Sequence, residues 1–97
     1  NLINGEYFEA TIIYIDNFGN LITNIENKFF QQISGIYKSS GELLDIIPGS
    51  HYSEVPEEKA LFFPGSSGFL EIGVNLNSAE KRFAISKREV LLFKRKD

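Results

Sequence analysis

The sequence predicts a mainly β fold, a small antiparallel β-barrel or sandwich with one or two short helices. Short apolar runs rich in β-branched and aromatic residues recur along the chain, and Gly, Pro, Asn and Ser turn signals separate them. The chain has 97 residues, of which 42% are hydrophobic and 13% aromatic. A chain of this size and composition can bury one core, so we expect residues 1–97 to form a single domain.

The first two strands are predicted on either side of a polar turn. Residues 8–15, FEATIIYI, have the β-branched and aromatic character of a strand, and residues 21–25 continue it after the turn DNFGN. Because only this short turn separates the two strands, we expect them to pair as a hairpin.

A short helix is predicted after the hairpin, in NIENKFFQQISG. Every fourth residue from Ile25 to Ile33 is apolar, which is the spacing of one helical face. Asn24 or Asn27 can cap the start of this helix, and Gly35 can end it.

The second half of the chain predicts further strands. Residues 36–38 and 43–47 flank the turn SSGE, and the second of these strands stops at Pro48. The stretch SHYSEVPEEK is a polar loop, and ALFFPGSSGFLEIGVN predicts two strands joined at residues 65–68. Ser78 can begin a helical turn, and EVLLF forms the last strand.

Charge and composition exclude several function classes. The net charge of −3 disfavours a nucleic-acid partner, because phosphate binding depends on Lys and Arg, and the basic end KRKD is interpreted as a solvated tail. No apolar run is long enough to cross a membrane, and no signal-peptide pattern opens the chain, so no membrane partner is expected. The chain contains no Cys, which fits a reducing cytoplasm.

A metal site and a catalytic triad are both disfavoured. His51 is the only histidine and no thiolate can join it, so it is interpreted as a solvent-exposed loop residue. Ser50, His51 and Asp45 can be written as a triad, but a chain with one His and many Ser offers such sets by chance.

Two polar turns are candidate binding elements. In DNFGN, Asp16 can hold an ammonium group, and the Asn20 amide can donate and accept at the edge of a heterocyclic base. In GSSG, Ser66 and Ser67 with nearby backbone N–H groups can cradle a small anion such as a carboxylate. Each turn is also an ordinary hairpin connection when taken alone. Tyr52 can stack on a ring or simply pack.

Three motifs in order carry a family resemblance. YIDNFGNLITNI, YSEVPE and GSSGFLEIGVNLNSA resemble the carboxyl-terminal domain of the S-adenosylmethionine hydroxide adenosyltransferases, which are S-adenosylmethionine hydrolases related to fluorinase and chlorinase. The resemblance runs from about residue 14 to residue 79. It implies the smaller domain of a cytoplasmic two-domain enzyme. The amino-terminal catalytic domain is absent from this chain, which we expect to be inactive by itself.

The resemblance also implies a quaternary arrangement. Members of the family are typically homotrimers, and substrate lies between the larger domain of one subunit and the smaller domain of its neighbour. S-adenosylmethionine is the substrate, and no cofactor or metal is implied. In the hydrolytic branch, water or hydroxide attacks the ribose carbon next to sulfur, giving adenosine and methionine.

Eight residues receive roles from the resemblance. The adenine edge would contact Asn20 and the backbone at Leu76, which follows Asn75. The adenosyl group would lie against Phe18 and Tyr52. The methionine ammonium would bind Asp16, and its carboxylate would bind Ser66 and Ser67.

The motifs depart from those of the halogenases in two places. One residue fewer separates Asp16 from Phe18, and Ser67 stands where the halogenases have Arg. Loss of a charged, bidentate carboxylate partner favours the hydroxide branch. The residues by themselves leave one alternative open, a stand-alone β module that binds a nucleoside or a protein partner.

Overall fold

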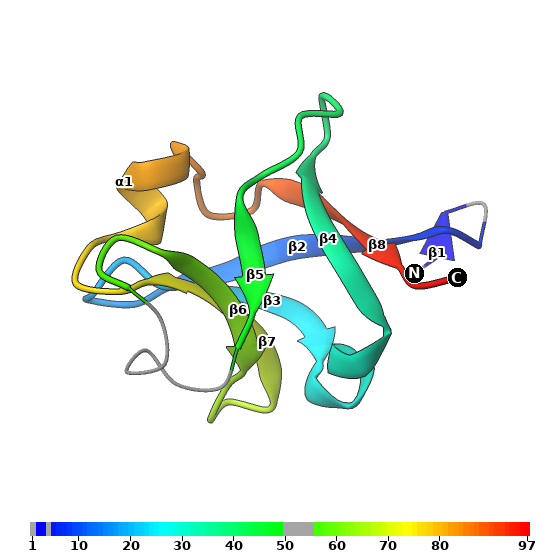
Figure 1. Cartoon of the computed structure of the whole chain (residues 1–97), viewed down its shortest axis with the longest axis horizontal. Coiled ribbons are helices and arrows are strands. Elements are labelled where there is room, and N and C mark those ends of the chain that lie inside the picture. Colours follow the sequence, from blue (N-terminus) through cyan, green and yellow to red (C-terminus); the bar gives the residue numbers. More distant parts are fainter. Residues whose placement is uncertain (1, 4, 50–55) are drawn as a thin grey trace.

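Figure 1 shows the fold in a computed structural model, which describes residues 2–3, 5–49 and 56–97. Seven strands form one nearly closed, barrel-like sheet in the order β4-β8-β2-β3-β7-β6-β5, and β1 pairs with β2 outside this path. The prediction of a mainly β fold with short helices is confirmed. The strands are β1 (Leu2–Ile3), β2 (Tyr7–Ile15), β3 (Leu21–Glu26), β4 (Ile33–Lys38), β5 (Ile46–Pro48), β6 (Ala60–Pro64), β7 (Phe69–Val74) and β8 (Val90–Arg95).

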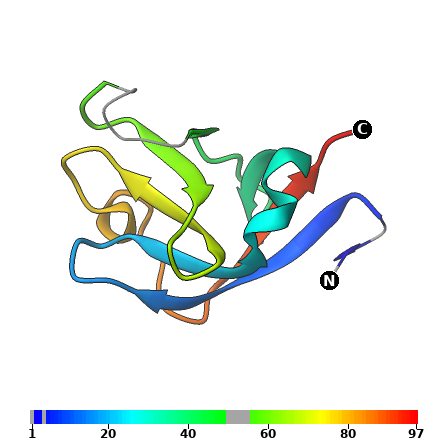
Figure 2. The ribbon, with the colours of Figure 1, turned by 90° about the horizontal axis from the view of Figure 1, so that it is seen from below.

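Antiparallel pairing dominates the sheet, as predicted, with one exception. β5 pairs with β6 in parallel, with Ile46 opposite Ala60. The two ends of the sheet, β4 and β5, approach each other through the segment between them: Tyr37 bridges Leu43, and the Leu44 N–H donates to the Ile36 carbonyl at 3.0 Å. Figure 2, turned by 90°, shows the strands wrapping around a common interior.

The interior is filled by apolar side chains from every main strand. Phe62 lies at its centre, with its ring centroid 5.4 Å from that of Phe30 and 6.3 Å from that of Phe93. Phe8 packs on Phe29 at 5.1 Å. These aromatic pairs add specific geometry to the burial of apolar surface that stabilises a small domain.

A short helix follows β3, as predicted, but its residues differ from the predicted helical face. The helix is the six-residue 3₁₀ helix η1 (Asn27–Gln32), whereas Ile25 and Ile33 belong to the flanking strands, where both are buried. Because the sheet buries these two β-branched side chains, their spacing reflects two strands rather than one helical face. Glu26 occupies the N-cap position without a side-chain hydrogen bond, and Gly35 lies inside β4.

The predicted strand at residues 43–47 is displaced. Leu43 is 61% exposed and makes only an isolated bridge, whereas β5 runs from Ile46 to Pro48. Pro48 is the last residue of β5 and is tolerated there because β5 is an edge strand, where a missing backbone N–H breaks no ladder.

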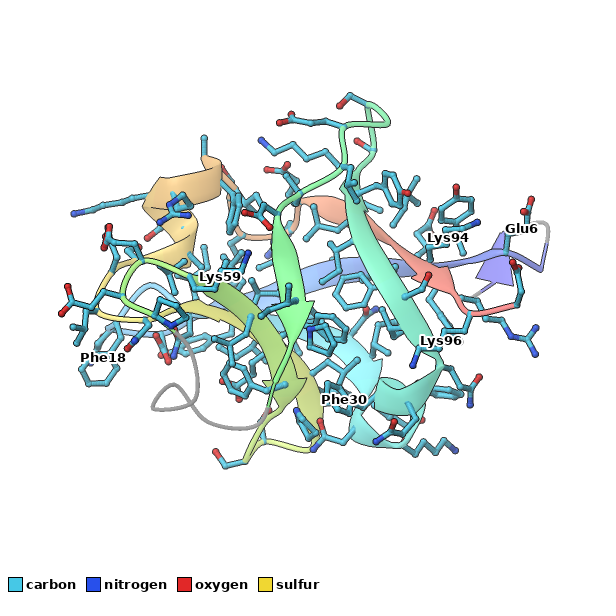
Figure 3. All side chains as sticks on the ribbon, viewed as in Figure 1. Glu6, Phe18, Phe30, Lys59, Lys94 and Lys96 are labelled. Atoms are coloured by element: carbon cyan, nitrogen blue, oxygen red, sulfur yellow. The ribbon has the colours of Figure 1, made fainter. Side chains whose placement is uncertain are left out.

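The predicted helical turn after β7 is confirmed as α1 (Ala79–Phe83). Ser78 is its N-cap, and the Ser78 side chain accepts a hydrogen bond from the Lys81 N–H at 3.2 Å. Ala84, with φ of 53°, ends the helix. In Figure 1, α1 lies at one end of the barrel, opposite β1 and the end of β8. Figure 3 shows the Phe18 ring at the α1 end and Lys94 at the other.

Candidate functional site

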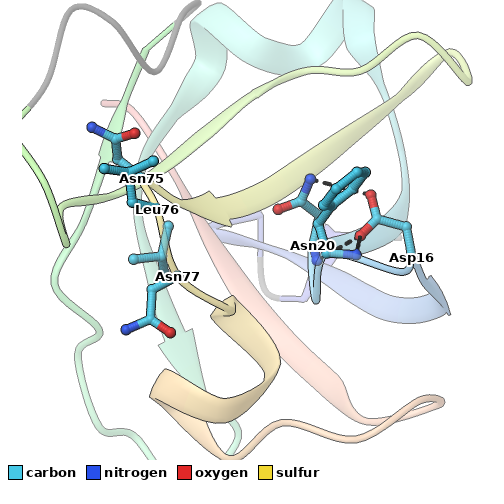
Figure 4. A pocket seen from close by; sticks show the side chains of 7 residues that line it. Asp16, Asn20, Asn75, Leu76 and Asn77 are labelled. Carbon is cyan, nitrogen blue, oxygen red and sulfur yellow. Dashed lines mark hydrogen bonds between the residues drawn. The ribbon is translucent and has the colours of Figure 1, made fainter.

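The turn between β2 and β3 is organised by one carboxylate. Asp16 Oδ1 accepts hydrogen bonds from the backbone N–H groups of Phe18 and Asn20, both at 2.9 Å. Asn20 Nδ2 donates to Asp16 Oδ2 at 3.1 Å (Figure 4). Asp side chains stabilise turns through such bonds to the following backbone. The turn therefore fixes the direction of the Asn20 amide and leaves Phe18 at its tip, 79% exposed.

Gly19 locks this turn against the start of α1. Its φ is +83°, and a Cβ built on it would lie 2.0 Å from Ser78 Oγ and 2.6 Å from Ser78 Cβ. The Gly19 carbonyl accepts a hydrogen bond from the Glu80 N–H at 3.0 Å. Only glycine fits this close approach, which sets the position of the turn relative to the loop before α1.

That loop forms the opposite wall of the site. Asn75 is held by backbone hydrogen bonds in both directions, to the Lys59 carbonyl at 3.0 Å and from the Glu58 N–H at 2.9 Å. Leu76 has φ of 60° and is 76% exposed. Within the described part of the chain, no residue pairs with the Leu76 backbone N–H or carbonyl. The loop therefore presents an apolar side chain and unpaired backbone polar groups at the same point.

A pocket of about 760 Å³, open to solvent, lies between the turn at residues 16–20 and the loop at residues 75–77. This volume lies within the usual range of small-molecule sites, and a mainly apolar lining with a few polar groups is typical of them. A flat heterocycle would find apolar surface and amide hydrogen-bonding groups here. The lining residues are Asp16, Phe18, Asn20, Val74, Asn75, Leu76 and Asn77.

The pocket brings together five of the eight residues singled out from the sequence. Ser66 and Ser67 do not line it: they are exposed in the turn before β7, whereas the pocket lies after the far end of β7. A six-residue strand is about 17–20 Å long, which separates the two places. Tyr52 lies outside the described residues. Val74 and Asn77 were missed, although Asn77 stands in the same NLNSA motif.

A buried carboxylate, Glu71, was also missed by the sequence reasoning. It lies in the middle of β7, opposite Ile22 of β3 and Phe63 of β6, and is 9% exposed. Burial raises the pKa of the Glu71 carboxyl above its usual value, and the nearby charge of Asp16 raises it further. In a strand, a polar residue between apolar ones normally marks the solvent-exposed face. The sequence around Glu71 therefore gives no sign that its carboxylate is buried.

The described residues offer neither a metal site nor a membrane-spanning helix. Over residues 2–3, 5–49 and 56–97, no group of three or more His, Cys, Asp or Glu side chains is arranged to hold a metal ion. Over the same ranges, no helix is long and apolar enough to span a bilayer.

Most of the chain matches one known protein family. Residues 10–91 match the family described as the SAM hydroxide adenosyltransferase C-terminal domain, where SAM is S-adenosylmethionine. This chain belongs to that family. The matched range contains the polar turn, the loop before α1 and Glu71, so the resemblance drawn from the three motifs is confirmed.

Two solved structures are similar in fold. An uncharacterized conserved protein from Thermotoga maritima superposes with a TM-score of 0.78 at 23% identity, over 87% of this chain and 34% of its own. A conserved hypothetical protein from Thermus thermophilus superposes with a TM-score of 0.65 at 26% identity, over 89% of this chain and 34% of its own. The chain therefore spans about a third of the length of these relatives.

Proposed function

We propose that this chain is the adenosyl- and methionine-binding half of an S-adenosylmethionine hydrolase, which uses water or hydroxide to give adenosine and methionine. The observation that carries the proposal is the pocket between the Asp16–Asn20 turn and the loop at residues 75–77, in a chain of this family. The enzyme would be a cytoplasmic homotrimer, and the amino-terminal domain of a neighbouring subunit would complete each site.

The adenosyl group would bind between exposed apolar side chains. Phe18 and Leu76 offer apolar surface on the two sides of the pocket, and Tyr52 would add a stacking ring. The Asn20 amide, oriented by its hydrogen bond to Asp16, would contact the adenine edge together with the Leu76 backbone, which pairs with no described residue. An amide and a backbone N–H and carbonyl can together match the donor and acceptor groups of a base edge.

The methionine portion would extend from this pocket toward the Ser66–Ser67 turn. The two hydroxyls would bind its carboxylate, and an acidic side chain would bind its ammonium. In the reaction, the water oxygen bonds to the ribose carbon next to sulfur and the carbon–sulfur bond breaks. The bond's electron pair returns to sulfur, which becomes the neutral thioether of methionine, and the water proton is released.

This chain's own contribution is to bind and orient the substrate. The substrate would be held at its adenosyl end and at its methionine end. Its ribose carbon next to sulfur would then face the partner domain, which would supply the groups that activate water. Holding reactants in one geometry lowers the entropic part of the barrier. The isolated chain should accordingly bind adenosine and release none from S-adenosylmethionine.

The test uses the natural full-length polypeptide. Folded and trimeric, it should release adenosine and methionine in equal amounts from S-adenosylmethionine, measured by chromatography. Replacing Asn20 by Ala should cost about 1–3 kcal/mol of adenosyl binding, because polar groups lose their partners. Asn17→Ala, in the same turn but outside the pocket lining, is the matched control. A folded trimer that releases no adenosine, or equal kinetics for the two variants, would contradict the proposal.

A further inference from the structure

Glu71 is a buried carboxylate without a partner in the described part of the chain. The residue is 9% exposed, and no described residue donates its carboxylate a hydrogen bond or forms an ion pair with it. The carboxylate oxygens still reach solvent, because no fully buried side-chain oxygen of the described residues lacks a hydrogen-bond partner. Partial removal from water makes an ionised carboxylate less stable unless a cation or hydrogen-bond donors compensate it. The fold therefore maintains a site for negative charge that its own described residues do not neutralise.

The surroundings of Glu71 are shaped to hold the carboxylate. A Cβ at Gly65 would lie 2.1 Å from Glu71 Oε2 and 2.5 Å from Glu71 Cδ. Gly65 does not have the positive φ that favours glycine, in contrast to Gly68 three residues later. Glycine is therefore needed at position 65 for steric reasons and not for backbone conformation. The absence of a side chain leaves room for the Glu71 carboxylate beside the start of the GSSG turn.

Asp16, unlike Glu71, accepts several hydrogen bonds from described residues. Its two carboxylate oxygens already accept three hydrogen bonds within the turn, from Phe18 and Asn20. A carboxylate has about four acceptor positions, so most of the capacity of Asp16 is used to shape the pocket. Glu71 has the free capacity, and Asp16 is close enough to act on it electrostatically.

We propose that Glu71 is the principal carboxylate that binds the ammonium group of the methionine portion, while Asp16 organises the turn and adds negative charge. This inference rests on the proposed function. An amino acid carries its ammonium and carboxylate on one carbon, and Glu71 lies against Gly65, directly before the two serines assigned to the carboxylate. An ammonium with three N–H donors can bind this partly desolvated carboxylate and offset its repulsion by Asp16.

The experiment measures dissociation constants by amide NMR titration of this chain with three ligands. Adenosine lacks the amino acid, S-adenosylhomocysteine has the ammonium without the sulfonium, and S-adenosylmethionine has both charges. The variants are Glu71→Gln, which keeps the shape and removes the charge, and Glu9→Gln, an exposed residue of β2, as matched control. Gly65→Ala is a second variant, whose methyl group displaces the intact Glu71 carboxylate.

The expected result is selective. Glu71→Gln and Gly65→Ala should weaken both ammonium-bearing ligands by about 10- to 100-fold, the range for a lost charged hydrogen bond, and adenosine by less than about twofold. Glu9→Gln should change none of the three. Equal losses for all ligands, no loss, or a loss confined to S-adenosylmethionine would overturn the assignment. Failure of the unaltered chain to bind adenosine would instead overturn the proposed function, so the two failures are distinguishable.

Discussion

Replacing Gly19 by Ala should destabilise the domain by about 2–4 kcal/mol. The positive φ of +83° accounts for about 1 kcal/mol, because a Cβ strains this conformation. The new methyl carbon would also lie 2.0 Å from Ser78 Oγ and 2.6 Å from Ser78 Cβ, so the N-cap of α1 must move. Loss of an N-cap costs about 1 kcal/mol, and displacement of the backbone at the start of α1 adds the remainder.

Urea unfolding, with midpoint and slope fitted together, measures this cost. Gly41→Ala is the matched control: its φ is +100° and nothing lies within 4 Å of the added Cβ, so it isolates the cost of the conformation, about 1 kcal/mol. In a Ser78→Gly background the two closest atoms are gone, and the Gly19→Ala cost should fall toward that of Gly41→Ala. A Gly19→Ala variant no less stable than Gly41→Ala would refute the proposed contact between the turn and α1.

Three further predictions concern a buried hydroxyl, a buried carboxyl and an exposed ring. Thr23→Val should lose about 1–3 kcal/mol of unfolding free energy, because its buried hydroxyl makes two backbone hydrogen bonds; an unchanged urea midpoint would contradict this. The raised pKa of Glu71 means that its ionisation destabilises the fold above that pKa, and that this penalty vanishes below the ordinary value of 4.5. Glu71→Gln should therefore raise the melting temperature at pH 7 and not at about pH 4, and a gain that does not depend on pH would count against it. Phe18→Ala should leave stability within about 0.5 kcal/mol, since the ring is 79% exposed, and weaken adenosine binding by about 1–3 kcal/mol; unchanged binding would remove Phe18 from the site.

The elements predicted correctly from sequence are those fixed by local chemistry. The β2–β3 hairpin follows from two apolar runs around Asp16, whose carboxylate binds the turn backbone. The start of α1 follows from the hydroxyl of Ser78. A short helix after β3 is present, but the helical face predicted for it was wrong. Ile25 and Ile33 lie in the two flanking strands and are buried by the sheet, a long-range effect that periodicity along the chain does not contain.

The same distinction applies to the candidate site. Asn20 and Leu76 could be singled out because turn and motif residues carry their chemistry locally, and the fold brings them to one pocket. Glu71 could not, because its burial depends on the neighbouring strands β3 and β6. The need for glycine at Gly65 is equally invisible in the sequence, since it arises from a side chain six residues away.

The most direct test of the pocket is a set of intermolecular NOE measurements between adenosine and this chain. Base binding between the turn and the loop predicts NOEs from the adenine H2 and H8 protons to the Phe18 ring and the Leu76 methyl groups, which line the same pocket. NOEs to residues elsewhere on the barrel, or none at millimolar adenosine, would contradict an adenosyl site at this end of the fold.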